Sequence, residues 1–422
     1  MGFEVDEEQV ADFGGYLGAE ASQTLPKIER LARDEGMSDH GFLGLLEPLG
    51  KAVNGPASEL VGEGFSLMQT KMCDLADGVI AAAKSYGYTE ETNKSTLERF
   101  GLDDNPGKEV TFGRYEYRYD PNASDQDFDK PRRGSYSQFR TTELSDVSID
   151  RPDTKYTDDI DVGPVLSVLD WIWSEFNVDG GKGFTDSIIS PLAGNYNSIN
   201  ANGEAWKKVG EQFGELVGNM GTNATTLAAN SWQGDAAEAF KQFIDVFWTR
   251  GAAWAGQKVG EFIALGFEKI ADASKQLAQL AVDAINKIIK LAAKIGSKFI
   301  PIVGWAWTAI EYGAWLLGID VDALHENIMQ IIDLAQKVFN LYENIETIVT
   351  TMEDYFNNAQ ELTDAVKKIP EIGSLEDAVS TYETIKDKGT EMEKQLKEID
   401  KAATEADKTL EEIDQTVEEA TG

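Results

Sequence analysis

The sequence has little of the residue types that most protein chemistry needs. It holds one cysteine, Cys73, and two histidines, His40 and His325. A single thiol excludes an intrachain disulfide framework and a thiolate zinc cluster. Basic residues are also scarce, since 38 Lys and Arg face 74 Asp and Glu, which gives a net charge of −36. So acidic a surface repels phosphate backbones, and we expect no nucleic-acid partner.

Sequence signatures of catalysis and of targeting are missing as well. The chain contains no phosphate-binding Gly-x-x-x-x-Gly-Lys-Ser/Thr loop and no Gly-x-Ser-x-Gly nucleophile turn. Asp322, His325 and Glu326 share one face of a predicted helix, which we interpret as an ordinary solvated face. We therefore expect no enzymatic activity, no cofactor and no metal site. The first residues lack the basic and apolar segments of a cleavable signal peptide.

Helical hydrophobic seams dominate what is present. Apolar residues recur at alternating steps of three and four, which predicts helices that pack against other helices. We predict an all-α fold in which two antiparallel helical hairpins, in regions 1–100 and 164–270, form a four-helix bundle. Residues 101–163 are rich in Asp, Pro, Gly and Ser and are predicted to be an irregular linker. The predicted seams are Val10, Phe13, Leu17, Ala21, Leu25, Ile28 and Leu31; Val61, Phe65, Met68, Met72, Leu75, Val79, Ala82 and Tyr86; and Leu192, Tyr196, Ile199, Gly203, Trp206, Gly210, Phe213, Val217, Met220, Ala224 and Leu227.

The C-terminal part divides by charge. Residues 271–320 are predicted to form a basic and apolar helical region, and residues 321–422 a coiled-coil-like acidic tail. Residues 241–300 hold nine basic and five acidic side chains, a net charge of +4. Residues 321–422 hold nine basic and 25 acidic side chains, a net charge of −16. We expect the two regions to attract each other.

Two short motifs carry the functional prediction. Trp232-x-Gly234 falls in the turn between two predicted helices, where glycine permits a positive φ and tryptophan covers the end of the bundle. An ordinary hairpin turn is the alternative interpretation. Tyr86-x-x-x-Glu90 ends the first hairpin, with both side chains on one helix face.

These motifs give the chain a resemblance to a known family. Met72–Val79 leads into Tyr86-x-x-x-Glu90, and Ile172–Trp173 leads into Trp206-x-x-x-Gly210-x-x-Phe213. With Trp232-x-Gly234, these segments resemble the Trp-x-Gly (WXG-type) helical-hairpin superfamily of type VII (ESX-type) secretion substrates. Among its members, the N-terminal region of the secreted channel and toxin proteins is the most similar. The acidic helical C-terminus departs from those toxins.

The resemblance implies a secreted, non-enzymatic export substrate or delivery module, without a cleavable signal peptide and with a place at the cell envelope. Its implied partners are the type VII export ATPase, small Trp-x-Gly proteins or a toxin, as in virulence or toxin delivery. Trp232, Gly234, Tyr86 and Glu90 would then form the secretion signal. Because the first hairpin lacks tryptophan and the second lacks a trailing Tyr-x-x-x-Glu, we hypothesise that one chain acts as both members of a hairpin pair.

Two other functions stay open. Residues 285–319 combine a basic stripe with an aromatic-rich apolar run, which suits a membrane-active or channel-forming protein. The same segment also suits a buried helix whose lysines face the acidic tail. A cytoplasmic coiled-coil adaptor is the third candidate. The residues that would contact a membrane are Lys287, Lys290, Lys294, Lys298, Trp305, Trp307 and Trp315.

Overall fold

The structure is a computed structural model. It describes residues 5–50, 57–58, 60–86, 139–152, 155–163, 165–234, 237–238, 240–241, 244, 253–298, 306–368, 384, 387–402 and 404.

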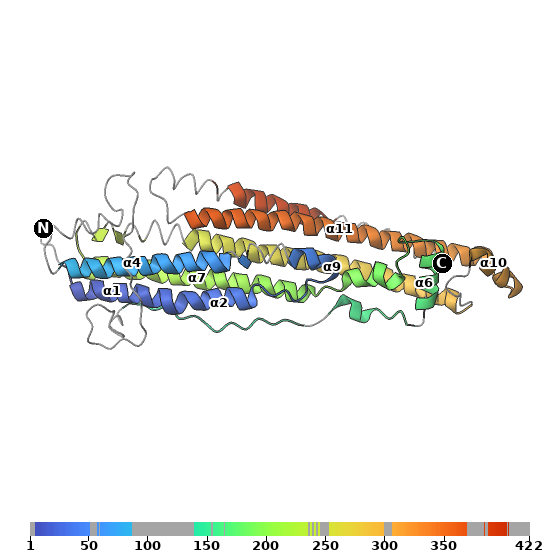
Figure 1. The fold of residues 1–422 in the computed structure, drawn as a ribbon, viewed down its shortest axis with the longest axis horizontal. Coiled ribbons are helices and arrows are strands. Elements are labelled where there is room, and N and C mark those ends of the chain that lie inside the picture. Colours follow the sequence, from blue (N-terminus) through green and yellow to red (C-terminus); the bar gives the residue numbers. More distant parts are fainter. Residues whose placement is uncertain are drawn as a thin grey trace.

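The protein is all-α, as the seams predict, and its helices lie along one long axis (Figure 1). In the described residues no β-strand is present, and an isolated antiparallel bridge joins Val5 to Trp232. The main helices are α1 (Glu7–Ala19), α2 (Leu25–Glu35), α4 (Phe65–Tyr86), α6 (Leu166–Glu175), α7 (Tyr196–Asn230), α9 (Ala253–Gly296), α10 (Trp307–Leu316) and α11 (Val321–Lys368); residues 387–402 are also helical. The shorter turns are η1 (Glu20–Thr24), η2 (Gly44–Leu46), η3 (Leu60–Gly64), η4 (Tyr156–Asp159), η5 (Thr185–Ile189) and η6 (Ser190–Leu192).

The first hairpin pairs α1 and α2 with α4. The π-helical turn η1 joins α1 to α2, so one helical arm runs from Glu7 to Glu35. A Cβ on Gly14 would lie 2.5 Å from Ile80, and one on Gly18 would lie 3.9 Å from Ala76, so the helices run antiparallel and approach closely. The described side chains of the two seams predicted for this hairpin are buried, except Leu31 and Met68, which are half-buried.

The second hairpin pairs α7 with α9. All eleven residues of the predicted seam from Leu192 to Leu227 are buried. A Cβ on Gly203 would touch Phe267, and one on Gly260 would touch Gly210. In each pair the two residues are equally far in sequence from residue 235, which directly follows the Trp232–Gly234 turn. The two helices therefore run antiparallel from that turn. α9 continues without a break past residue 270, where the sequence suggested a division between the second hairpin and the basic region.

An outer layer covers α9. A Cβ on Gly266 would meet Met352, Tyr355 and Phe356 of α11, so glycine permits the close approach of the two helices. Residues 387–402 lie beside both, because Lys269 of α9 forms a 2.8 Å ion pair with Asp400 and Glu361 of α11 forms one of 2.8 Å with Lys388. The Lys269–Asp400 pair links residues 241–300, whose net charge is positive, to the acidic tail.

Candidate functional site

The start of the chain's first helix is bonded to the turn of the second hairpin. Val5 forms its bridge with Trp232, and the Asp6 N–H donates to the Ser231 carbonyl over 2.8 Å. The Asp6 side chain caps α1 by accepting from the Gln9 N–H, and the Ser231 hydroxyl donates to the Gln9 side-chain oxygen. We call residues 5–9 and 230–234 the N-terminal tip. Backbone and capping bonds together fix one hairpin against the other there.

Trp232 is the buried centre of this tip. Its side chain has 0% exposure, and its ring lies 5.1 Å from Phe240. Phe240 in turn lies edge-on to Phe13 of α1, at 5.7 Å. Gly234, with φ of +114°, is exposed and supplies the left-handed backbone that the reversal needs. The indole therefore acts by packing, while the following residues of the turn face outward.

The end of α4 lies at the same end of the molecule. The antiparallel register of Gly14 with Ile80 places Tyr86, six residues further along α4, close to the level of the start of α1. Figure 1 shows this end of α4 beside the end of α7. Tyr86 is the last residue of α4, and its side chain lies outside the described residues, as does Glu90.

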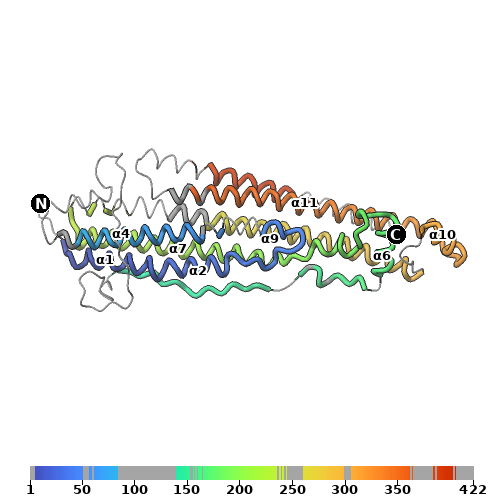
Figure 2. The backbone as a smooth tube through the Cα atoms, in the orientation of Figure 1, coloured from blue at the N-terminus to red at the C-terminus, as the bar shows by residue number. Residues whose placement is uncertain are grey.

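Residues 139–152, which we call the strap, run in extended form along α7 (Figure 2). The Asn223 side chain binds the backbone N–H and carbonyl of Arg140, and the Asn195 side chain donates to the Pro152 carbonyl. Twelve extended residues at roughly 3.4 Å each cover about 41 Å, and the 28 helical residues between the two asparagines cover about 42 Å at roughly 1.5 Å each. The strap therefore matches α7 in length.

Between these anchors, further buried amides of α7 hold the strap. The Gln212 side chain donates to the Ser145 carbonyl over 3.2 Å, and Asn219 donates to the Thr142 hydroxyl over 3.2 Å. Glu20 of the first hairpin accepts from the Thr142 N–H over 2.7 Å. Since strap, α7 and first hairpin share these bonds, the strap joins the two hairpins.

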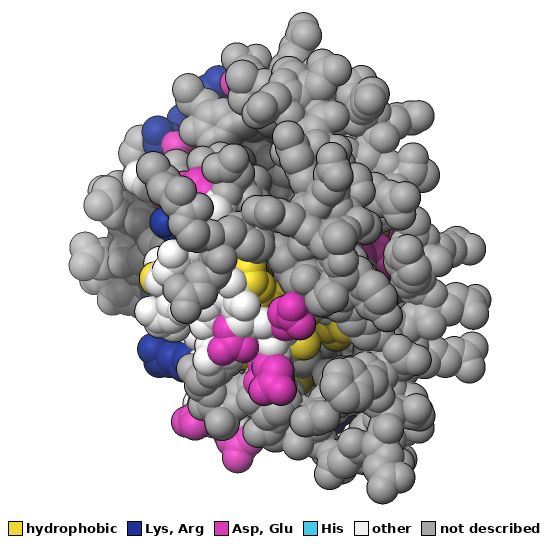
Figure 3. Space-filling view, turned by 90° about the vertical axis from the view of Figure 1, so that its left-hand side faces the viewer, with side chains coloured by type: hydrophobic (Ala, Val, Ile, Leu, Met, Phe, Trp, Pro, Cys, Tyr) yellow, Lys and Arg dark blue, Asp and Glu magenta, His cyan; other side chains and the backbone are white. Residues whose placement is uncertain are grey.

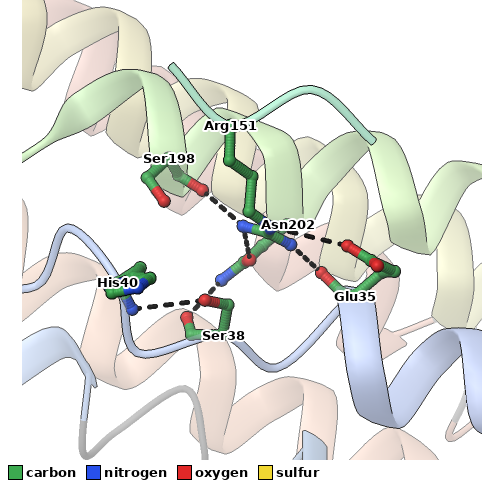
Figure 4. Close-up of polar contacts among 6 residues, drawn as sticks. All are labelled: Glu35, Ser38, His40, Arg151, Ser198 and Asn202. Atoms are coloured by element: carbon green, nitrogen blue, oxygen red, sulfur yellow. Dashed lines mark hydrogen bonds and ion pairs between the residues drawn. The ribbon is translucent and has the colours of Figure 1, made fainter. Parts of the chain in front are cut away.

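Arg151 ends the strap in a polar junction (Figure 4). Its guanidinium donates to the Ser198 carbonyl over 3.0 Å, to the Asn202 side chain over 2.8 Å and to the Glu35 carbonyl. Asn202 also donates to the Ser38 carbonyl. A cation at the carbonyl end of α2 is favourable because it complements the helix dipole and satisfies a terminal acceptor.

Burial perturbs the acidic groups of the first hairpin. Glu20 is 2% exposed, and burial raises its pKa, an effect that hydrogen bonds from Thr24 and Thr142 partly oppose. Burial, followed by repulsion from Asp74, raises the pKa of Asp77 to about 7. Burial also raises the pKa of Cys73 to about 11, so the thiol stays protonated at neutral pH and is a poor nucleophile.

The predicted membrane segment splits into a packed part and an exposed part. Trp307 packs on α6, with its ring 6.3 Å from Trp171, whereas Trp315 is 68% exposed. Lys287 is half-buried, and Lys290, Lys294 and Lys298 are exposed. Trp305 lies outside the described residues. Among the helices that the structure describes, none combines the length and apolar character needed to cross a bilayer.

In the part of the chain that the structure describes, Asp322, His325 and Glu326 of α11 have no further metal-ligating side chains beside them. The His325 ring lies 5.5 Å from Trp307, and the described residues contain no cluster suited to a metal ion. The His40 backbone N–H donates to the Ser38 hydroxyl in a turn.

The sequence patterns missed several of these contacts. Buried amides lie beside the seam, at the N-cap of α7 and along the helix: Asn195, Asn202, Gln212, Asn219 and Asn223. Asn and Gln residues that recur beside an apolar seam indicate that another segment packs there, because buried amides require hydrogen-bonding partners. Nothing local to Arg151 or Val5 indicates a partner that is distant in sequence.

Comparisons with known proteins assign no family to this geometry. No family model, no curated protein and no solved structure matches the chain.

Proposed function

We propose that this protein is a non-enzymatic substrate or delivery module of a type VII (ESX-type) secretion system, in which one chain acts as both members of a hairpin pair. One observation carries the proposal: the Trp232–Gly234 turn of the second hairpin is bonded to residues 5 and 6 of the first, at the end of the molecule where α4 terminates. A bipartite export signal needs its two parts at one end, and this arrangement supports that requirement.

Within this proposal the signal residues have different roles. Trp232 has no exposed surface, so it is a positioning residue that sets the turn against the start of α1. Gln233 and Gly234 are exposed and available to a partner. Tyr86, the last residue of α4, and Glu90 supply the other part of the signal, to which the export ATPase or a small Trp-x-Gly partner would bind. Delivery of a toxin is the corresponding cellular role.

The test is export from cells that carry an intact or an inactivated type VII system. The tagged full chain should appear in the supernatant of the first strain only. Tyr86→Ala and Glu90→Gln should each reduce the exported fraction about tenfold or more, because each removes one contact of the proposed signal. The matched control is Glu346→Gln, which alters an exposed Tyr-x-x-x-Glu glutamate of α11 and should leave export unchanged.

Two results would overturn the proposal. One is a chain that stays with the cells in both strains while folded, which would favour the cytoplasmic adaptor. The other is normal export of the Tyr86→Ala and Glu90→Gln variants. Circular dichroism of each purified variant separates loss of recognition from loss of folding.

A further inference from the structure

The end of the rod opposite the N-terminal tip exposes four large apolar side chains in six residues. We call Tyr312, Trp315, Leu316 and Leu317 the distal tip; their exposed fractions are 64, 68, 61 and 67%. The rings of Tyr312 and Trp315 stack at 6.1 Å. Soluble proteins commonly expose single apolar residues, but a contiguous cluster of this kind marks an interaction site.

The helix α10, which carries most of the distal tip, is bonded to the rest of the protein on its inner side. The α10 N-terminus is bonded to α6, since the Trp307 N–H donates to the Glu175 carboxylate over 2.7 Å. Glu311 is the single acidic residue of α10, and its carboxylate accepts a hydrogen bond from the Trp307 indole. Ile310 and Ala314 are buried on the inner face of the helix. The outer face of α10 is thereby left apolar and is presented at the extremity of the rod (Figure 1).

Basic side chains lie at the same end. Lys290, Lys294 and Lys298 are exposed on the last turns of α9 and just beyond it. A Cβ on Gly296 would lie 3.4 Å from Val168, so this end of α9 contacts α6, which also holds Trp307. The Asp320 carboxylate nearby caps α11 by accepting from two backbone N–H groups. The exposed lysines can therefore meet anionic groups beside the apolar cluster.

From these observations we propose that the distal tip is a shallow docking surface for the interfacial layer of a lipid bilayer. Tryptophan and tyrosine favour that layer because each combines an apolar ring with a polar group, and lysines beside them bind lipid phosphates. The proposal goes beyond export, and it does not require α10 to span the bilayer. The protein would lie with this end on the membrane and its N-terminal tip directed away.

The area of the tip favours a bilayer over a second copy of the chain. Four side chains exposed by about two thirds offer on the order of 500 Å², given that a large aromatic side chain buries about 150–250 Å². Two tips in contact would bury on the order of 1,000 Å², below the 1,200–2,000 Å² or so of a stable protein interface. A bilayer needs no complementary shape and accommodates a small wedge.

The first test measures partition of the purified full chain into phosphatidylcholine vesicles by flotation. We expect the Trp315→Gln/Leu317→Gln double variant to lose about tenfold or more in partition, because it removes apolar area that the bilayer would bury. The matched control is Leu43→Gln/Met329→Gln, which changes apolar side chains that are 47 and 45% exposed elsewhere on the rod. The control should partition like the unmodified chain. Equal partition of the tip variant and the unmodified chain would overturn the proposal.

The second test separates the charge contribution and the alternative occupant. Lys294→Glu/Lys298→Glu should weaken binding severalfold to vesicles that also contain phosphatidylglycerol, with little change on phosphatidylcholine alone. Sedimentation velocity over a range of concentrations should show no dimer of the unmodified chain that disappears in the Trp315→Gln/Leu317→Gln variant. Such a dimer would overturn the proposal by assigning the tip to self-association, as would binding that the lysine changes leave intact on anionic vesicles. Both tests are read on purified protein, so they are independent of export.

Discussion

The two ends of the rod use tryptophan in opposite ways. At the N-terminal tip Trp232 follows the end of α7, is completely buried and packs on Phe240. At the distal tip Trp315 lies near the end of α10, is 68% exposed and stacks on Tyr312, which is 64% exposed. Both occur near reversals of the helical chain, so sequence position alone does not separate them. The surrounding packing decides whether an indole holds the structure together or offers a surface.

The difference assigns different chemistry to each end. Exposed groups of the N-terminal tip are the turn residues Gln233 and Gly234 and acidic side chains at the start of α1. Figure 3, which faces this end, shows Asp and Glu side chains around a small apolar area in its described part. The described part of this end is therefore largely polar and acidic. The distal tip, by contrast, has apolar area to bury.

The largest expected effect removes the buried indole. Trp232→Ala should lower the free energy of unfolding by about 3–5 kcal/mol, because it leaves a cavity among packed aromatic rings. Trp232→Phe should lose less, since a ring still lies against Phe240. Urea denaturation followed by circular dichroism measures both. A loss below about 1 kcal/mol for the alanine variant would contradict the packing role of Trp232.

The next effect tests whether the strap joins the two hairpins. Arg151→Ala removes a half-buried guanidinium that bonds to α2 and α7, and hydrogen bonds to charged groups contribute about 1.5–3 kcal/mol each. We expect a loss of about 2–3 kcal/mol in unfolding free energy and faster hydrogen exchange in residues 139–152. Arg140→Ala is the matched control, because Asn223 binds the backbone of Arg140 and its side chain is exposed. Equal loss in both variants would argue against a specific junction.

Much of the fold was predictable because it follows from short-range periodicity. The seam from Leu192 to Leu227 alternates in steps of three and four, and every member is buried. The end of α7 at Asn230 follows from the turn residues that come after it. Helix boundaries and buried faces depend on neighbours a few residues away, so one sequence suffices to derive them.

The contacts that assemble the site could not be derived in this way. Val5 and Trp232 are far apart in sequence, and a two-residue bridge leaves no periodic signal. The strap has an irregular composition, so the sequence showed a linker without indicating where it docks. The apolar run 299–319 also gave no sign that Trp307 packs while Trp315 is exposed, because that depends on α6.

A smaller effect concerns pH and the N-terminal half. Burial raises the pKa of Glu20 and raises that of Asp77 to about 7, so the folded protein binds these protons more tightly than the unfolded chain. The stabilisation from Asp77 is thus fully present below about pH 4 and is lost as pH rises through about 7. The midpoint temperature of thermal unfolding should therefore decrease as the pH is raised from about 5 to about 8. Glu20→Gln/Asp77→Asn should flatten this dependence, whereas exposed Glu204→Gln should preserve it.

The smallest expected effect is the counterpart of the first. Trp315→Ala should change the unfolding free energy by no more than about 0.5 kcal/mol, because the side chain is mostly solvated and its removal opens no cavity. The share of tryptophan emission that acrylamide quenches should fall in this variant, since an accessible indole has been removed. A loss comparable to that of Trp232→Ala would mean that Trp315 packs against the protein. The contrast between the two ends would then disappear, and with it the apolar surface on which bilayer docking depends.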